Sequence, residues 1–271
     1  MTSSHWDDQL AARYREFRYE FAERTLAGKS VVVAGGAGGL GAALVALLAR
    51  EGAHVVCGYR SNHERAKSLA AAVKQQFGAE IQLVAGDILD APVRQRYAEA
   101  VAAAGTPLAG VAIFPGDPAR VKWEELTREA MEASLAANYT GPVLLARDLC
   151  EPMEKSDGGA LVLLSTMQAV TPFEGSVNYA APKAALVQAA RILARQWRRV
   201  RVNVVAPGAT VVGMAEASVS SGKYDAFVDK GTIARFGRPE DVARAVRFFL
   251  EPDNYVTGQV LVVDGGLTSR R

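Results

Sequence analysis

Cysteine and net charge are both scarce in this chain. It has 2 cysteines in 271 residues, Cys57 and Cys150, which excludes a disulfide-rich scaffold and is typical of buried thiols in a reducing compartment. Its formal net charge is +2, too small to create a field that draws a protein to nucleic acid. We therefore expect no disulfide, no metal site and no nucleic-acid partner.

Signals for export or membrane insertion are also missing. Residues 1–8 lack a basic start and an apolar core, so they do not form a secretory signal. Residues 30–49 carry no charge over a length that could span a membrane, but the glycines near their centre argue against such a helix. The sequence predicts a cytoplasmic protein without a membrane partner.

Length and apolar content indicate one α/β domain. Hydrophobic residues make up 49% of the chain, enough to bury a large core. Seven apolar runs alternate with helix-prone stretches and predict strands at residues 31–33, 55–57, 81–84, 111–114, 161–164, 202–205 and 260–263. Near-continuous apolar strands belong to a parallel sheet that helices cover on both faces, a doubly wound fold.

A glycine cluster follows the first predicted strand. Gly35, Gly39 and Gly41 lie between three valines and the apolar run 42–49, so the order is strand, tight turn and helix. Glycines let the backbone approach a pyrophosphate, and the helix N-terminus directs unpaired N–H groups towards it. The cluster predicts a dinucleotide site, because a flexible loop fits poorly between such strong flanking signals.

Tyr179 and Lys183 are four residues apart in an Ala-rich, helix-prone run. On a helix both side chains share one face, where an ammonium group beside a phenol stabilises the phenolate and lowers its pKa. Such a tyrosine can give a proton to a carbonyl oxygen or take one from an alcohol. Taken alone, the pair fits an ordinary exposed helix face better than a catalytic site.

Together with further motifs, these features resemble the short-chain dehydrogenase/reductase family. Ala34-Gly35-x-x-x-Gly39-x-Gly41 is similar to the family's T-G-x-x-x-G-x-G turn, with alanine in place of threonine. Further similar segments follow in the family's order: Gly86-Asp87-Ile88, Asn138-Tyr-Thr-Gly141, the strand that leads to Ser165-Thr166, Val202-Asn203-Val-Val-Ala-Pro207-Gly208, Arg235-Phe-Gly-Arg-Pro239 and Thr257 to Gly266. The resemblance implies a single Rossmann-fold domain at residues 26–271, preceded by a helical extension at residues 1–25.

The resemblance also implies roles for individual residues. Tyr179 would be the acid/base, and Lys183 would lower its pKa and hold the nicotinamide ribose. Thr166, rather than its neighbour Ser165, would donate a hydrogen bond to the substrate oxygen, and Asn138 would anchor a proton-relaying water. The implied cofactor contacts are Gly35, Gly39, Leu40, Gly41, Asp87, Ile88, Gly116, Tyr179, Lys183, Pro207 and Gly208.

The end of the second predicted strand favours NADP(H) over NAD(H). NAD-using relatives place an acidic residue about where Tyr59 stands. Here Arg60 offers a fork suited to a 2′-phosphate, with the Ser61 hydroxyl and the Asn62 amide nearby. NADP-using relatives often carry a second basic residue in the glycine turn, which this chain lacks, so NAD(H) stays the alternative.

Three features depart from the family or strain the prediction. The family's N-N-A-G is residues 113–116 here, so only Gly116 is kept, and Phe114 and Pro115 are expected to reshape the cofactor pocket. The threonine that relatives place five residues after Pro207 is Val212, with Thr210 as a possible substitute. Pro182, between the catalytic pair, fits only the first turn of a helix or a kink.

The predicted activity is reduction of a small-molecule ketone to an alcohol, with a 3-oxoacyl, polyketide or aromatic substrate. Apolar residues in the segment 209–232 would bind it. Two alternatives stay open: the same fold acting on an imine or another non-ketone substrate, and a catalytically weak cofactor-binding regulatory protein.

Three predictions concern partners. The arginines at 195, 198, 199 and 201 fit a solvated helix end or, less well, a docking patch for an acidic carrier of the substrate. Trp6 and the aromatic residues within 7–24 have the spacing of one amphipathic helix, packed on a subunit or closing over the cleft. Small residues at 184–190 favour close helix pairing in a homotetramer, with a dimer as the alternative.

Overall fold

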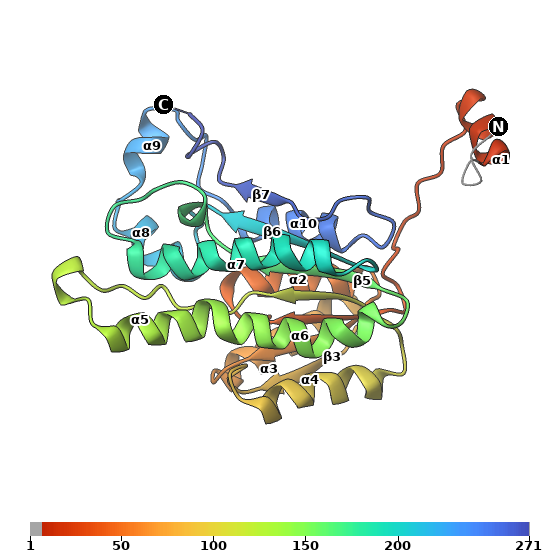
Figure 1. The fold of residues 1–271 in the computed structure, drawn as a ribbon, viewed down its shortest axis with the longest axis horizontal. Coiled ribbons are helices and arrows are strands. Elements are labelled where there is room, and N and C mark those ends of the chain that lie inside the picture. Colours follow the sequence, from red (N-terminus) through yellow and green to blue (C-terminus); the bar gives the residue numbers. More distant parts are fainter. Residues whose placement is uncertain (1–6, 271) are drawn as a thin grey trace.

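The computed structural model describes residues 7–270, and a sheet of seven parallel strands runs through its centre (Figure 1). The strand order is β3-β2-β1-β4-β5-β6-β7. The strands are β1 (Ser30–Ala34), β2 (His54–Tyr59), β3 (Ile81–Ala85), β4 (Leu108–Ile113), β5 (Gly159–Leu164), β6 (Val200–Pro207) and β7 (Val260–Val263). The predicted doubly wound α/β fold is confirmed, and Phe114 alone of the predicted strand residues lies outside its strand.

Helices cover both faces of the sheet. One face carries α2 (Gly39–Arg50), α3 (His63–Phe77) and α10 (Pro239–Leu250), and the other carries α4 (Ala91–Ala104), α6 (Gly141–Glu154) and α7 (Val177–Gln196) (Figure 1). Each face has its own apolar core, into which the valines and leucines of the central strands project alternately. This two-sided burial explains why the strands lack polar alternation.

The loops that follow the strands meet at one edge of the sheet. The chain runs outward from β1 through β2 to β3 and then returns to β4, so the switch in strand order lies between β1 and β4. Ligands of open α/β sheets bind at such a point, outside the carboxyl ends of the strands. The smaller elements gather at this edge: η1 (Trp123–Glu125), α5 (Arg128–Leu135), the π-helix η2 (Ala136–Thr140), η3 (Met167–Ala169), η4 (Gly213–Ala215), α8 (Glu216–Ser220) and α9 (Asp225–Asp229).

The N-terminal helix is shorter than predicted. Helix α1 (Asp8–Arg15) begins with Asp7 as its N-cap and ends where Phe17 adopts a left-handed conformation, with φ of 56°. Trp6 lies outside the described residues. No residue of α1 is buried, and Phe17 and Phe21 are almost fully exposed. Most helical stability in proteins comes from packing of an amphipathic face, and no residue of α1 is buried in such a contact, which accounts for the early end.

The segment before β1 lies away from the cleft that the strand ends form. In Figure 1, α1 projects from the side of the molecule opposite α5, α8 and α9, and none of its described residues lines the cleft. In this structure α1 neither packs on its own domain nor closes over the cleft.

Helix α7 passes through Pro182 without ending. Proline cannot bond to the carbonyl four residues back, so the Asn178 carbonyl loses its helical partner. The Ser134 hydroxyl of α5 donates a short hydrogen bond to that carbonyl instead. Pro182 is the sixth residue of α7 and therefore lies beyond its first turn, where a neighbouring helix satisfies the group that proline leaves unpaired.

The arginine cluster lies at the amino ends of the strands. Arg201 donates to the carbonyls of Phe249 and Glu251 and so closes the C-terminus of α10. Arg199 donates to the Ser156 carbonyl. Strand β6 begins here and reaches the cleft only at its other end, so a carrier docked on these arginines would sit far from the cleft.

Within residues 7–270 no helix is long and apolar enough to cross a membrane.

Candidate active site

A cleft of about 1480 Å³ opens at the carboxyl ends of the strands. We call its deep part, formed by Gly116, Asn138, Thr166, Tyr179 and Lys183, the floor. We call the residues 117–125 after β4 and the segment 209–232 after β6 the mouth. All predicted site residues line the cleft except Asn138, which is fully buried behind Gly116: Gly35, Gly39, Leu40, Gly41, Arg60, Ser61, Asn62, Asp87, Ile88, Gly116, Thr166, Tyr179, Lys183, Pro207 and Gly208.

The glycine turn leaves no room for larger residues. Gly35 has φ of 73°, and a Cβ there would lie 3.1 Å from the Phe114 Cβ and 3.2 Å from the Pro115 Cδ. A Cβ at Gly41 would lie 2.4 Å from the Gly35 carbonyl oxygen. Helix α2 begins directly after the turn without any side-chain cap, so its first N–H groups stay available to an anion. Phe114 and Pro115, which come directly after the neighbouring strand β4, thus pack against the glycine turn.

Two arginines stand beside the end of β2, although the sequence predicted only one. Arg60 is exposed and lines the cleft together with Ser61 and Asn62. Arg65, in the first turn of α3, lines it too and donates from Nε to the Ala37 carbonyl in the glycine turn, at 2.7 Å. Arg65 therefore supplies the cation that the glycine turn itself lacks.

Asn62 contributes less than expected to this cationic corner. Its Oδ1 accepts the N–H of Arg65 at 3.0 Å as the N-cap of α3, which leaves only its amide N–H groups for a ligand. Tyr59, where relatives that use NAD place an acid, forms a short hydrogen bond with His63. No carboxylate stands at this strand end.

The loop after β3 is held in place by Arg94 of α4. Asp87 accepts the N–H of Leu89 with one carboxylate oxygen, and the buried Ile88 follows it. Arg94, 6% exposed, donates to the carbonyls of Ile88 and Leu89 at 2.8 Å each and pairs with Asp148 at 2.6 Å. The sequence did not identify Arg94, whose role becomes visible only when α4 and α6 pack together.

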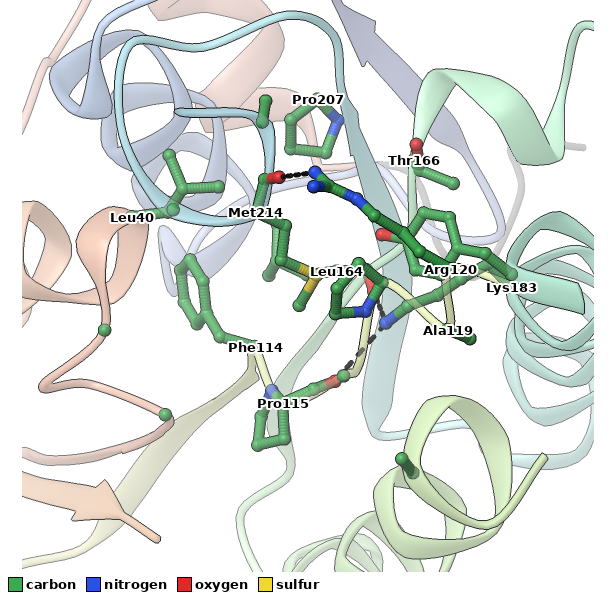
Figure 2. Close-up of a pocket in the computed structure, with 18 of the residues that line it drawn as sticks. Leu40, Phe114, Pro115, Ala119, Arg120, Leu164, Thr166, Lys183, Pro207 and Met214 are labelled. Carbon is green, nitrogen blue, oxygen red and sulfur yellow. Dashed lines mark hydrogen bonds between the residues drawn. The ribbon is translucent and has the colours of Figure 1, made fainter. Parts of the chain in front are cut away.

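Lys183 is buried in the floor and forms no ion pair with an acidic side chain of residues 7–270. Its Nζ donates to the Leu164 carbonyl at 2.9 Å and to the Pro115 carbonyl at 3.3 Å (Figure 2). Burial lowers the pKa of this ammonium group to about 7. An ammonium carries three donors, so one is left to face the cleft.

Gly116 and Asn138 fit closely around Lys183. A Cβ on Gly116 would lie 2.7 Å from Asn138 Oδ1 and 3.0 Å from Lys183 Nζ, which explains why this glycine alone is kept from the family's motif. Asn138 lies in the π-helix η2, accepts the Asp117 N–H at 3.0 Å and donates to the Asp117 carbonyl at 2.9 Å. π-Helical turns occur often at functional sites because they redirect a side chain.

A hydrogen-bond chain joins Asn138 to α7. Asn138 Nδ2 also donates to the Ser134 hydroxyl at 3.2 Å, and this hydroxyl donates to the Asn178 carbonyl that Pro182 leaves free. Ser134 is therefore a positioning residue that sequence reasoning missed. The one available signal was Pro182, since a mid-helix proline always frees a carbonyl.

Thr166 and Ser165 point to different partners. The Ser165 hydroxyl donates to the Lys183 carbonyl of α7 at 3.0 Å and is thus committed to the backbone. The side chain of Thr166 accepts the N–H of Gln168 at 3.3 Å, lines the cleft and acts to lower the pKa of Tyr179. This geometry favours Thr166 as the hydroxyl that would contact a substrate.

The Tyr179 phenol has a raised pKa rather than a lowered one. Burial raises it to about 12, the Thr166 side chain acts in the opposite direction, and the charge of Asp117 raises it further. We expected Lys183 to lower this pKa. Burial of the phenol dominates instead, and Lys183 directs its ammonium towards two main-chain carbonyls.

The segment after β6 reaches over the glycine turn. A Cβ on Gly39 would lie 2.8 Å from the Gly213 nitrogen and 3.2 Å from the Val212 Cβ. Thr210 is buried and donates to the Val212 carbonyl at 3.0 Å, so its hydroxyl is occupied within the segment. Met167, Tyr224 and Ile233 form a small apolar core beneath it, with Ala209 and Leu267.

Within residues 7–270 no cluster of His, Cys, Asp and Glu side chains could hold a metal ion.

Known proteins are similar to this chain over most of its length. A family model described as enoyl-(acyl carrier protein) reductase matches residues 35–268. D-threitol dehydrogenase of Mycolicibacterium smegmatis is 30% identical over 90% of this chain and 94% of its own length. The 3-oxoacyl-(acyl-carrier-protein) reductase of Rickettsia felis is 31% identical over 89% of this chain and 98% of its own.

Solved structures agree in fold. A short-chain dehydrogenase/reductase from Serratia marcescens superposes with a TM-score of 0.81 at 30% identity and covers 90% of this chain and all of its own. L-sorbose reductase from Gluconobacter frateurii, solved with NADPH and L-sorbose, has a TM-score of 0.81 at 25% identity over 92% of this chain and 100% of its own.

Proposed function

The chain belongs to the short-chain dehydrogenase/reductase family, and we propose that it uses NADPH to reduce a ketone to an alcohol. One observation carries this proposal. Tyr179 and Thr166 both line the floor of the cleft, where Thr166 acts to lower the pKa of the phenol, beside a buried Lys183 that has no carboxylate partner among the described residues. A site that only bound a nucleotide would not need this arrangement at its deepest point.

The cleft fits a nicotinamide dinucleotide. The uncapped N-terminus of α2 and the glycine turn suit a pyrophosphate, Asp87 and Ile88 lie where the adenine would bind, and the third donor of Lys183 suits a ribose hydroxyl. When bound, such a cofactor would supply the hydride. The protein's own task is then to bind the carbonyl compound and deliver a proton to its oxygen.

Tyr179 is the proposed proton donor. Its pKa of about 12 keeps the phenol protonated at neutral pH, which is the form that ketone reduction requires. Thr166 would donate to the same oxygen as negative charge develops on it. In ketone reduction the phenol would act as the acid, and in alcohol oxidation at the same site the phenolate would act as the base.

Lys183 is the proposed source of the replacement proton. With a pKa of about 7, its Nζ can take up and release a proton at neutral pH. Asn138 and Gly116 fix its surroundings, so Nζ stays between the Pro115 and Leu164 carbonyls while one donor faces the cleft.

Arg60 and Arg65 favour NADP(H) over NAD(H). Both arginines line the cleft at the end of β2, and Tyr59 takes the place of the ribose-binding acid. A guanidinium group binds phosphate through paired charge-assisted hydrogen bonds. L-sorbose reductase, which shares the fold, was solved with NADPH.

The substrate and assembly are proposed more coarsely. The apolar side chains that line the cleft, such as Met214 at the mouth and Phe173 after η3, suit a small carbonyl compound. A cytoplasmic homotetramer remains our prediction for the assembled protein. Sedimentation at micromolar concentration would test the assembly; a monomer alone would contradict it.

A turnover screen tests the function. Purified protein is incubated with NADPH or NADH and a panel of ketones that includes 3-oxoacyl thioesters, hydroxyketones and aryl ketones, with cyclic imines as a separate set. NADPH deuterated at the transferable position should yield an alcohol that carries deuterium on the carbinol carbon.

The alternatives give different results. Turnover of imines but not of ketones would replace the proposal with imine reduction. Cofactor binding by calorimetry without turnover of any substrate would point to a regulatory protein.

A further inference from the structure

Arg120 reaches across the mouth of the cleft. It lies in the loop after β4, is exposed to solvent, and lines the same cleft as Tyr179 and Thr166. Its Nη2 donates to the Met214 carbonyl at 2.7 Å and contacts the Ser218 hydroxyl at 3.4 Å. Figure 2 shows the side chain extended over the cleft between the labelled Thr166 and Met214.

The backbone that carries Arg120 is held in an unfavourable conformation. Ala119 has φ of 47°, in the left-handed region that costs a non-glycine residue roughly 1 kcal/mol. Two polar contacts hold it: Asp117 Oδ1 accepts the Ala119 N–H at 2.7 Å, and Asn178 Nδ2 donates to the Ala119 carbonyl at 3.2 Å. Strained residues that are fixed in this way cluster where a side chain must be aimed.

The same contacts connect Arg120 to the floor. Asp117 is bonded through both its N–H and its carbonyl to Asn138, and Asn178 lies about one helical turn before Pro182 on α7. The loop that aims Arg120 is therefore braced by residues that also position Asn138. This bracing holds the backbone from which the Arg120 side chain extends.

Arg120 has no acidic partner within the described residues. Glu124, Glu125, Glu174 and Glu216 line the same cleft, yet none forms an ion pair with it. Lys122, two residues along the loop, pairs with Glu125 at 3.6 Å instead. The planar guanidinium group of Arg120 carries five N–H donors. Its Nη2 donates to the neutral Met214 carbonyl, and the remaining donors are available to a ligand in the cleft.

We propose that Arg120 binds an anionic group of the substrate, a carboxylate or a phosphate, so that the enzyme acts on acidic carbonyl compounds. This inference rests on the proposed function and specifies its substrate class. A charge-assisted, bidentate bond to an oxyanion is stronger than the bond to the Met214 carbonyl and would replace it. The carbonyl of the substrate would then lie towards Tyr179, with its acid group at the mouth.

Matched substrates test this inference. A series of 2-, 3- and 4-oxo acids is compared with the corresponding methyl esters and with ketones that carry an amine. Dihydroxyacetone phosphate and dihydroxyacetone provide the phosphate pair. In wild type we expect kcat/KM for one class of anion to exceed that for its uncharged counterpart by about tenfold or more.

Substitutions then assign the preference to one side chain. Arg120→Ala should lower kcat/KM for the anionic substrate by about ten- to a hundredfold and leave the uncharged one within about threefold. Arg120→Lys should recover part of the loss, since it restores charge but not the fork. Lys122→Ala, which removes the same charge from the same loop, should retain the preference.

A binding measurement separates this inference from the proposed function. Trp123 lies three residues beyond Arg120 and lines the cleft, so its fluorescence should report binding of a hydroxy acid in the presence of NADP⁺. Arg120→Ala should weaken this binding by about tenfold even where no turnover is measured.

Two results would overturn the inference. Equal losses on charged and uncharged substrates in Arg120→Ala would make Arg120 only a structural clasp on the segment after β6. A wild-type preference for the esters or the amines would exclude an acidic substrate. Turnover of no ketone at all would instead overturn the proposed function, and the fluorescence titration alone would then decide the role of Arg120.

Discussion

In the floor of the cleft, Lys183 is 2% exposed and donates to two main-chain carbonyls, whereas at the mouth Arg120 is exposed and reaches Met214 from another loop. The floor is built from residues of η2 and α7 and from the chain that directly follows β4 and β5, where the sheet and its helices fix the backbone. The mouth is built from the loop after β4 and from the segment 209–232 with its short helices, and Arg120 joins the two through its bonds to Met214 and Ser218. The difference suggests that the floor sets the chemistry and the mouth selects the substrate.

The largest expected effect comes from the floor. Tyr179→Phe removes the proposed proton donor without creating a cavity, and we expect kcat to fall by about 10²–10⁴-fold while NADPH affinity stays unchanged. Steady-state kinetics and a cofactor titration check both parts. Turnover close to that of wild type would show that Tyr179 is not the proton donor. It would also contradict the idea that the floor sets the chemistry while the mouth selects the substrate.

The second prediction separates two neighbouring hydroxyls in the floor. Thr166→Ala should lower kcat by roughly a hundredfold because it removes a donor to the developing charge, and Thr166→Ser should retain most activity. Ser165→Ala is the matched control, because that hydroxyl bonds to the Lys183 carbonyl rather than facing the cleft. A greater loss in Ser165→Ala than in Thr166→Ala would mean that the assignment is one residue out of register.

The third prediction moves to the cofactor end of the cleft. Arg60→Ala should lower kcat/KM for NADPH by roughly ten- to a hundredfold with little change for NADH, since a charge-assisted bond contributes about 1.5–3 kcal/mol. Arg65→Ala should cause a smaller selective loss, because Arg65 is partly engaged by the Ala37 carbonyl. Equal losses with both cofactors would indicate damage to the turn rather than loss of a phosphate contact, and a wild-type preference for NADH would contradict the assignment.

The sequence predicted the floor better than the mouth for a physical reason. Buried strands and the glycine turn have few alternatives, so apolar runs and the spacing of Gly35, Gly39 and Gly41 predicted the sheet that the structure confirms. The predicted site residues on the strand ends and the glycine turn also line one cleft. Their roles stay predictions until activity is measured.

The residues that were missed depend on contacts between distant segments. Arg65 reaches the glycine turn from the next helix, Ser134 meets α7 only because Pro182 frees a carbonyl, and Arg120 is aimed by a strained alanine. None of these contacts has a periodic or spaced signature in the sequence. The length of α1 was wrong for a related reason, since periodicity indicates an amphipathic helix but not whether anything packs against it.

The last prediction compares a buried lysine in the floor with an exposed one at the mouth. The pKa of Lys183 is about 7 in the folded protein and about 10.5 when the chain is unfolded. Between these values the unfolded chain holds a proton at Lys183 that the folded protein lacks, so raising the pH favours folding. Below pH 7 both states are protonated, and the cost of burying Lys183 is present in full.

Lys183→Met removes this dependence. The free energy of unfolding of wild type, measured in urea, should therefore rise relative to that of Lys183→Met as the pH is raised from about 7 to 9.5, by at most roughly 1.4 kcal/mol per pH unit. Lys122→Met, at the exposed mouth, should show no such change relative to wild type. A pH-independent difference for Lys183→Met would mean that the ammonium of Lys183 stays charged in the folded protein, and Lys183 would then act in the floor as a fixed cation rather than as a group that exchanges protons at neutral pH.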